Sequence, residues 1–388
     1  MLAVFLILIK ISYLSKNLKT TTHYLSTLSN FECMEQQNCS QLEPLPSPKS
    51  GNFTFKDIFG WGLPFQKTFY NTTLSPPGVI LEINSVSGIG NQLFVYACSY
   101  ALAKRKNWPL YIHFPKQNLA FRQFQPNQRE FVLDKFTIPL DNIIQLGVTQ
   151  FPPGQSQLWL SDEDLLERKY NKTSNQFMQL DYSSCCQSEL YWKEYEQDIH
   201  RLFQVRTDSL NLTRIQKPLK EITSTESVAV HVRRGDFVRD ESYTFPTQFH
   251  MKAVHLMVEM LRRERNVENP VFFVFTDDTT YAKRKFKEFS KIYQFVFVSE
   301  GNNTSVEDFF LMCLCKHIIF PNSTFSWWAA VLNKNKKKLV ITSAFNPQYF
   351  KIWNSNNKAK EFYKMSYGTF YHRKEWTVID PFSGGLVT

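Results

Sequence analysis

The clearest pattern of hydrophobic and polar positions lies in the second half of the chain, where short apolar runs alternate with stretches of helical length. Val228–Val232 and Val271–Phe275 are β-branched or aromatic runs bounded by polar residues, which predicts buried strands. The same pattern predicts strands at Phe295–Val298, Ile318–Phe320 and Leu339–Thr342, and helices at Thr247–Arg265, Thr280–Phe289, Ser305–Lys316 and Phe325–Leu332. Ser305 is the predicted N-cap of its helix. Repeated strand–helix units predict a mostly parallel, doubly wound α/β sheet.

A further strand–turn–helix unit is predicted earlier in the chain. Val79–Ile83 is a strand candidate, Ser87–Phe94 contains two glycines, and Val95–Lys106 has a helical pattern. Closely spaced glycines let the backbone approach a ligand, and a helix N-terminus favours an anion. Leu110–Phe114 is the next predicted strand, whereas Pro115–Glu226 is irregular and aromatic-rich, and its pattern does not place individual elements.

The length of 388 residues suggests two domains, and the apolar start of the chain is shorter than the ~20 residues that span a bilayer. That start is a cleaved signal, a short signal-anchor or an ordinary chain start. The next stretch is polar and proline-containing, as in a stem. We therefore expect residues 1–14 to be the hydrophobic segment, 15–78 a stem, 79–226 and 227–360 two Rossmann-like domains, and 361–388 a C-terminal tail.

Composition indicates which classes of ligand the protein binds and in which cellular compartment it folds. The formal charge of +10 suits anionic ligands, but the basic residues are scattered and no nucleic-acid-binding pattern is present, so we expect no nucleic acid partner. Cys98, Cys313 and Cys315 lie in apolar helical patterns, which predicts buried thiols. A secretory route is favoured by the apolar start and by sequons at Asn38, Asn52, Asn71, Asn171, Asn211, Asn302, Asn303 and Asn322.

Polar residues that could bind a ligand follow the predicted strand Val228–Val232. Arg233 and Arg234 come directly after it, and Gly235 and Asp236 follow. Ligands of open α/β sheets bind outside the carboxyl ends of the strands, and the planar guanidinium matches phosphate oxygens two at a time. The pattern is typical of a clamp for a diphosphate, and the alternative is a solvated basic turn.

Two more polar clusters follow predicted strands of the same sheet. They are Thr276, Asp277 and Asp278, and the run Asn322–Phe325. Because parallel strands place their carboxyl ends side by side, we expect both clusters to line one crevice with the arginines. An aspartate can accept from ribose or base donors, and hydroxyls at a helix start can bind phosphate oxygens. The alternative is that each cluster only caps a helix.

These residues carry a resemblance to a known family. The sequence resembles the α-1,2-fucosyltransferases of glycosyltransferase family 11, over four stretches in the order that this family has them. The stretches are Gly88–Lys104 (GIGNQLFVYACSYALAK), His231–Val238 (HVRRGDFV), Phe273–Asp278 (FVFTDD) and Asn322–Leu332 (NSTFSWWAAVL), with Asn346, Pro347 and Trp353 in the terminal segment.

The resemblance implies transfer of L-fucose from GDP-β-L-fucose to the 2-hydroxyl of a terminal galactose on a glycan, with inversion. It implies a GT-B-like fold, in which two Rossmann-type domains face a cleft, and no obligatory metal or other cofactor, because arginines replace the cation. We expect a single-pass type II protein of the Golgi membrane with a lumenal catalytic domain, or a secreted form. The alternatives are a protein O- or core α-1,6-fucosyltransferase, or an inactive protein that binds a glycan or a nucleotide sugar.

The resemblance also suggests roles for single residues. Arg234, with Arg233, is expected to stabilise the departing GDP, and Asn91 to lie near the sugar. Asp236 is the expected general base; Asp240 and Glu241 are alternatives. We expect the substrate-binding residues to be His231, Arg233, Arg234, Asp277, Asp278, Ser323, Thr324, Phe325, Gly90 and Gln92, and we expect no metal ligands.

Overall fold

The computed structural model describes residues 77–83, 87–113, 129–140, 143–144, 156–160, 176–180, 186–235, 247–300, 303–344 and 371–387. All of these belong to one compact unit, Thr54–Thr388. Within these ranges, no helix is both long enough and apolar enough to cross a membrane. The predicted N-terminal segment, 1–14, and residues 15–76 of the predicted stem 15–78 lie outside the described residues. The first strand begins at Gly78, so the described fold includes the last residue of the predicted stem.

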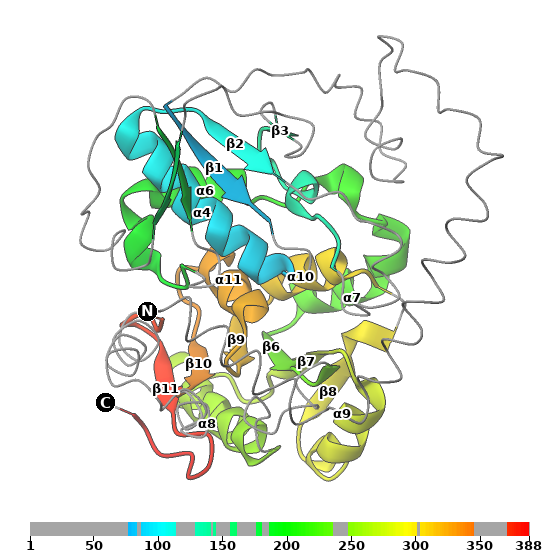
Figure 1. Cartoon of the computed structure of the whole chain (residues 1–388). Helices are drawn as coiled ribbons and strands as arrows, with labels where there is room; N and C mark the ends of the chain where they lie inside the picture. Colours follow the sequence, from blue (N-terminus) through cyan, green and yellow to red (C-terminus); the bar gives the residue numbers. More distant parts are fainter. Residues whose placement is uncertain are drawn as a thin grey trace, which may run out of the picture. The chain divides into compact units, whose positions relative to one another are not determined.

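The first sheet is parallel, with strand order β3-β2-β1-β5-β4 (Figure 1). Helix α4 (Ile89–Lys106) packs against β1 and β2 through Leu81, Ile112 and the apolar side of the helix. The predicted strands at Val79–Ile83 and Leu110–Phe114 are confirmed with ends shifted by one residue. The strands are β1 (Gly78–Glu82), β2 (Leu110–His113), β3 (Ile143–Ile144), β4 (Ser156–Leu160) and β5 (Gln176–Leu180).

The second sheet is also parallel, with strand order β11-β10-β9-β6-β7-β8. Each of its predicted strands is confirmed, so the predicted parallel α/β architecture is correct. A strand that we did not predict, β11, lies in the expected C-terminal tail 361–388 and forms an edge of this sheet. The strands are β6 (Ser227–Val232), β7 (Val271–Thr276), β8 (Gln294–Phe297), β9 (His317–Phe320), β10 (Val340–Ser343) and β11 (Thr377–Ile379).

All five predicted helices are present, with ends shifted by up to six residues. The stretch Pro115–Glu226, for which we predicted no elements, contains β3 to β5 and two further helices. The sequence did not reveal them, because their local pattern is irregular and their packing partners are distant in the sequence. Two differences at helix starts bear on the packing. Thr304, not Ser305, is the N-cap of α10, because its hydroxyl accepts from the Glu307 N–H while the Glu307 carboxylate accepts from the Thr304 N–H. The other helices are α6 (Glu196–Leu202), α7 (Leu212–Ser224), α8 (Thr247–Arg265), α9 (Thr279–Phe286), α10 (Ser305–Leu314) and α11 (Thr324–Leu332). Short 3₁₀ turns lie at Leu133–Lys135, Glu189–Tyr191, Lys193–Tyr195, Thr207–Ser209, Phe289–Lys291 and Val298–Glu300.

The second difference concerns the glycine-containing turn predicted at Ser87–Phe94. Helix α4 begins at Ile89, so Gly90 and Asn91 lie in its first turn rather than in a loop. The first N–H groups of a helix have no intrahelical partners. Glycine is a poor helix former, so its presence at this position needs another explanation. Here the reason is a close contact with α11, described below.

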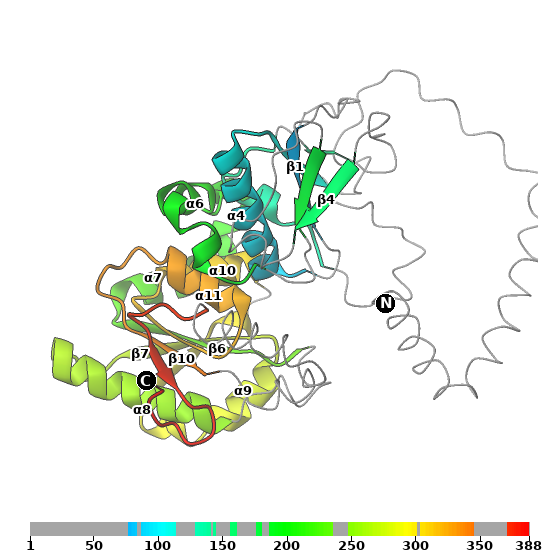
Figure 2. The ribbon, with the colours of Figure 1, turned by 60° about the vertical axis from the view of Figure 1, so that its left-hand side comes forward.

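An aromatic cluster joins α4 to α11. The Phe94 ring lies 4.6 Å from the Trp327 ring and 4.9 Å from the Trp328 ring, and Trp192 stacks on Trp328 at 5.1 Å. All four side chains are buried. Helices α10 and α11 lie beside α4 in both views (Figures 1 and 2), so one core includes helices that follow strands of both sheets.

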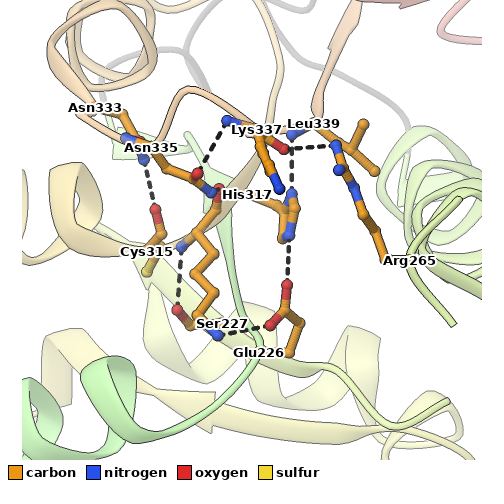
Figure 3. A network of polar contacts seen from close by, with 10 residues as sticks. Glu226, Ser227, Arg265, Cys315, His317, Asn333, Asn335, Lys337 and Leu339 are labelled. Carbon is orange, nitrogen blue, oxygen red and sulfur yellow. Dashed lines mark hydrogen bonds and ion pairs between the residues drawn. The ribbon is translucent and has the colours of Figure 1, made fainter. Parts of the chain in front are cut away.

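A polar network holds together the amino ends of three strands in the second sheet (Figure 3). The Glu226 carboxylate accepts from Lys316 Nζ at 2.6 Å and from His317 Nε2 at 2.9 Å. His317 Nδ1 accepts from the Leu339 N–H at 2.9 Å, so the imidazole is neutral with its proton on Nε2. Lys316 N–H donates to Ser227 Oγ at 3.1 Å. Because these are amino ends, the network stabilises the fold on the side opposite the predicted ligand edge.

The predicted burial of the cysteines is confirmed for Cys98 and Cys315, which are each 1% exposed. Cys313 is partly buried. Cys98 lies in α4 and Cys313 in α10, as the pattern predicted, whereas Cys315 is the C-cap residue of α10 with an extended backbone.

Candidate active site

The carboxyl ends of β6, β7 and β9 are adjacent in the second sheet. β6 lies between the other two, and Val232 at its end is in register with Thr276 at the end of β7. Arg233 and Asp277 therefore follow directly from neighbouring strand ends. The predicted proximity of the arginine and aspartate clusters is confirmed.

A single carboxylate, that of Asp277, organises the turn after β6. It forms an ion pair with Arg233 Nη1 and accepts from the backbone N–H groups of Arg234 at 2.8 Å and Gly235 at 3.0 Å. A Cβ on Gly235 would lie 2.5 Å from Asp277 Oδ2, so a side chain at this position would displace the Asp277 carboxylate that organises the turn. Asp277 thus supports the arginine turn, a role that its position in the sequence did not reveal.

The Arg234 side chain contacts Asp278, the N-cap residue of α9, and Tyr281 in the first turn of that helix. Its guanidinium carbon lies 3.7 Å from the centroid of the Tyr281 ring, and its Nε lies 3.6 Å from Asp278 Oδ2. Asp278 also caps α9, because its Oδ1 accepts from the Tyr281 N–H at 2.9 Å. Arg234 Nε is buried and has no hydrogen-bond partner within the described ranges. A stacked, 24% exposed guanidinium at a strand end is oriented to bind an anion.

His231 lies inside the protein, behind the arginines. Its Nδ1 is 2.9 Å from Ser326 Oγ, and its backbone carbonyl accepts from His250 Nε2 at 3.0 Å. Because Ser326 Oγ donates to Ser323 O at 3.3 Å, it accepts from His231 Nδ1–H. Burial, with the nearby Arg233 as a second cause, lowers the pKa of His231 to about 3, so the ring is neutral. We predicted His231 as a substrate ligand; its observed contacts join β6 to the start of α11.

The predicted cluster after β9 forms the start of α11. Ser323 occupies the N-cap position and is 8% exposed, while Thr324 and Phe325 are half-buried. The Phe325 ring lies 5.5 Å from His231 and 5.3 Å from Phe309. These residues therefore lie at the carboxyl edge of β9, next to β6, as predicted.

Gly90 brings the first turn of α4 against the first turn of α11. A Cβ on Gly90 would overlap the Thr324 carbonyl and lie 2.5 Å from the Phe325 nitrogen, and these are backbone atoms that cannot rotate away. The N-terminal ends of two helices therefore meet beside the arginine edge. Asn91 Oδ1 at this junction is buried without a hydrogen-bond partner among the residues described. The junction brings Gly90 and Asn91 to the residues that follow β9, although they are more than 200 positions apart in the sequence.

Gln92 has a structural role that differs from the predicted one. Its Nε2 donates to Ser87 O at 2.8 Å and to Glu130 O at 2.6 Å, and its Oε1 accepts from the Val132 N–H at 3.0 Å. The residue is 1% exposed. Because both amide protons are used and the side chain is enclosed, Gln92 holds the loop before α4 rather than contacting a ligand.

The predicted base Asp236 and its alternatives Asp240 and Glu241 lie outside the described residues. Within the described part of the chain, no group of three or more His, Cys, Asp or Glu side chains lies close enough to hold a metal ion. Sequence reasoning missed Tyr281 and Ser326, which contact Arg234 and His231. Nothing in the pattern marks them, because one lies in an ordinary amphipathic helix and the other in an apolar one.

The chain is similar to proteins of a known family. Residues 90–366 match the family model of glycosyl transferase family 11. An α-1,2-colitosyltransferase of Escherichia coli is 32% identical, covering 70% of this chain and 92% of that protein. The galactoside 2-alpha-L-fucosyltransferase SEC1 of Bos taurus is 26% identical, covering 66% of this chain and 65% of that protein. The crystal structure of fucosyltransferase NodZ from Bradyrhizobium is 17% identical with a TM-score of 0.41, covering 66% of this chain and 92% of NodZ. The family match spans all the described residues of the candidate site, and the chain belongs to glycosyl transferase family 11.

Proposed function

We propose that this protein transfers L-fucose from GDP-β-L-fucose to the 2-hydroxyl of a terminal galactose, forming an α linkage with inversion. The observation that carries the proposal is the pair Arg233 and Arg234 at the end of the central strand β6, held by Asp277, Asp278 and Tyr281. Membership of family 11 and the activities for which its relatives are named support the same reaction.

In the proposed mechanism, Arg233 and Arg234 bind the diphosphate of GDP. The bond between fucose and the diphosphate breaks through an oxocarbenium-like state, and negative charge grows on the leaving phosphate oxygen. Fixed guanidinium groups stabilise that charge more in the transition state than in the ground state. The N-terminal ends of α4 and α11, which meet at Gly90, add positive potential at the same edge.

The acceptor side needs a group that takes the proton of the galactose hydroxyl. We propose Asp236 for this role, with Asp240 and Glu241 as alternatives, and we propose that Asn91 contacts the sugar. A carboxylate near the attacking hydroxyl increases its nucleophilicity as the bond to fucose forms. Ser323, Thr324 and Phe325 are proposed to contact the nucleotide from the start of α11.

The test is transfer by the full-length chain, purified from a secretory host, with GDP-fucose and lactose. We expect an α-fucosyl residue on the galactose 2-hydroxyl, with its linkage and anomeric configuration read by NMR. We propose that no metal is required, so activity in EDTA is expected to remain within about twofold, because the arginines supply the charge that a cation would otherwise supply. Strict dependence on Mn²⁺ would contradict that part.

The outcomes separate the alternatives. Saturable binding of GDP-fucose without transfer to any galactoside would indicate a binding protein. Transfer to a protein hydroxyl or to the 6-hydroxyl of N-acetylglucosamine would indicate another fucosyltransferase class. Absence of GDP-fucose binding would contradict the whole proposal.

A second donor is suggested by the relative that acts as an α-1,2-colitosyltransferase. Colitose is fucose without its 3-hydroxyl, so the two donors differ by one polar group. Competition between GDP-fucose and GDP-colitose for lactose measures the preference directly. We expect fucose to be favoured, and a higher kcat/KM for GDP-colitose would reassign the donor.

The stacking of Arg234 on Tyr281 predicts a graded effect of substitution. Tyr281→Leu is expected to lower kcat/KM for GDP-fucose by roughly three- to thirtyfold, because the guanidinium loses the aromatic face that orients it. Tyr281→Phe is the matched control and retains activity, because the face remains. Equal losses in both variants would contradict this role, and thermal unfolding of each variant separates it from a general loss of stability.

We also propose that the protein acts in the Golgi lumen, anchored through residues 1–14, and that its two parallel sheets are the two domains of a GT-B fold. The sequons and the apolar start support the compartment. Co-localisation of the tagged full-length chain with a Golgi marker, and digestion of its glycans by a glycosidase, test this placement.

A further inference from the structure

A second polar cluster lies at the carboxyl edge of the first sheet. Glu82 at the end of β1 is in register with His113 at the end of β2, and Gln179 comes from β5 on the other side of β1. Successive side chains of a strand point to opposite faces. The cluster therefore lies on the face opposite α4, because the neighbouring residues Leu81, Ile112 and Met178 belong to the core that includes α4.

The contacts within this cluster are incomplete. Gln179 Nε2 donates to Glu82 Oε2 at 2.5 Å, which fixes one carboxylate oxygen. His113 Nδ1 is 4.0 Å from Glu82 Oε1, which is too far for a hydrogen bond. The His113 side chain is only 7% exposed, and its Nδ1 has no hydrogen-bond partner in the described part of the chain. A buried polar atom without a partner is costly, so a group that bonds to His113 Nδ1 would stabilise this cluster.

The geometry defines the kind of group that fits. An oxygen about 2.8 Å from both His113 Nδ1 and Glu82 Oε1 would bridge the 4.0 Å gap with two hydrogen bonds of ordinary length. A hydroxyl can donate to the Glu82 carboxylate while it accepts from the Nδ1–H of a neutral imidazole. When Glu82 is protonated, the hydroxyl can instead accept from the carboxyl O–H and donate to an unprotonated Nδ1. Burial lowers the pKa of His113 to about 4, so its ring is neutral, and burial raises the pKa of Glu82.

The charge of the described residues in this cluster does not suit a phosphate. Among the described residues, no lysine or arginine forms an ion pair with Glu82, and a carboxylate repels phosphate oxygens. Neutral hydroxyl groups of a sugar suit this set of acceptors and donors. The first-sheet cluster therefore suits neutral hydroxyl groups, whereas the arginine edge of the second sheet suits anions.

The chain connects the two edges. β1 ends at Glu82, the next described residues lead into α4, and Gly90 in the first turn of α4 packs against Thr324 at the end of the connection from β9. Both connections leave the carboxyl ends of their sheets, which is where ligands bind in open α/β folds.

We propose that Glu82, His113 and Gln179 form a binding site for a hydroxyl of the acceptor sugar. Glu82 and His113 contact the hydroxyl, and Gln179 orients the carboxylate. This proposal rests on the proposed function for the identity of the acceptor, and it adds the residues that recognise it. It assigns these residues to binding and leaves proton transfer to another group.

The test compares Glu82→Gln and His113→Phe with the wild-type full-length chain, using GDP-fucose and lactose. We expect the KM for lactose to rise by about ten- to a hundredfold in both variants, because each loses one hydrogen bond to a charged or buried group. The KM for GDP-fucose and the slow hydrolysis of GDP-fucose in the absence of lactose are expected to stay within about twofold. Asp134→Asn, at a buried carboxylate outside the cluster, is the matched control with an unchanged lactose KM.

Each outcome has a defined meaning. An unchanged lactose KM in folded variants would overturn the proposal. It would indicate that a buried water, and not the acceptor, bridges His113 Nδ1 and Glu82 Oε1. A fall in kcat at constant lactose KM would also overturn it, because Glu82 would then act in the chemistry. If a variant does not fold, His113→Gln replaces it, since it keeps a neutral polar side chain and is expected to show a smaller rise.

A binding measurement keeps this proposal separate from the reaction. Saturation-transfer NMR with lactose and the wild-type chain reads the site without turnover, and the signal is expected to be lost in Glu82→Gln. If GDP-fucose is not a substrate but lactose binding depends on Glu82, the donor assignment fails and the acceptor site stands. If lactose binding does not depend on Glu82, the acceptor site fails whatever the donor is.

Discussion

Arg234→Ala is expected to lower kcat/KM for fucosyl transfer by about 10²–10³-fold, the range found when one preorganised electrostatic group is removed from an active site. Its guanidinium carbon lies 3.7 Å from the Tyr281 ring centroid, and its Nε lies 3.6 Å from Asp278 Oδ2. The side chain is therefore ordered before the substrate binds and loses little conformational entropy on binding. The measurement is initial-rate kinetics with GDP-fucose and lactose, together with the melting temperature of the variant.

The control for this prediction is Arg263→Ala on α8, whose side chain is 76% exposed and pairs with Glu264. It removes the same charge from the chain and is expected to leave the kinetics unchanged. Arg234→Lys is expected to recover only part of the activity, because an ammonium neither stacks flat on Tyr281 nor donates to two oxygens at once. Normal transfer by a folded Arg234→Ala protein would rule out the diphosphate clamp.

Gly90→Ala is expected to reduce stability and activity together. The added Cβ would overlap the Thr324 carbonyl, so α4 and α11 must separate, and Phe94 lies 4.6 Å from Trp327 in the interface that they share. Overpacking of this kind costs roughly 1–3 kcal/mol, which corresponds to a fall in Tm of roughly 3–10 °C. The kcat/KM for transfer is expected to fall by more than the loss of folded protein explains, because the junction also positions Asn91.

Gly88→Ala is the matched control for this substitution. Gly88 lies two residues earlier, its backbone is at φ −71° and ψ 176°, and a Cβ there would meet nothing within 4 Å. We expect its Tm and kinetics to stay close to those of the wild-type chain. Equal effects of the two substitutions would indicate that backbone entropy, and not the contact with α11, governs this segment.

The two predicted effects concern different levels of the structure. Arg234 acts through its positive charge beside the leaving phosphate, where negative charge grows in the transition state. Gly90 acts by allowing α4 and α11 to approach each other closely. A variant of the first kind is expected to keep the wild-type melting temperature, and a variant of the second kind is not. Thermal unfolding therefore separates loss of chemistry from loss of packing in both series.

Some features of this protein are determined by the sequence alone. The apolar runs at Val228–Val232 and Val271–Phe275 are buried on both faces, so their strands could be predicted from local pattern, as could the helix at Thr247–Arg265. The order of strands and helices then implied parallel pairing. That pairing placed Arg233 beside Asp277, because residues after adjacent parallel strands share one edge.

Other features were decided only by the tertiary structure. Gln92 and His231 lie inside motifs that suggested ligand contact, yet both bond within the fold, because burial and partners depend on segments distant in the sequence. Local pattern cannot show the contact of Tyr281 with Arg234 for the same reason. The Glu82 and His113 cluster likewise forms only when β1 pairs with β2. Local pattern determines which elements form, whereas packing between elements determines which polar groups are left to bind a ligand.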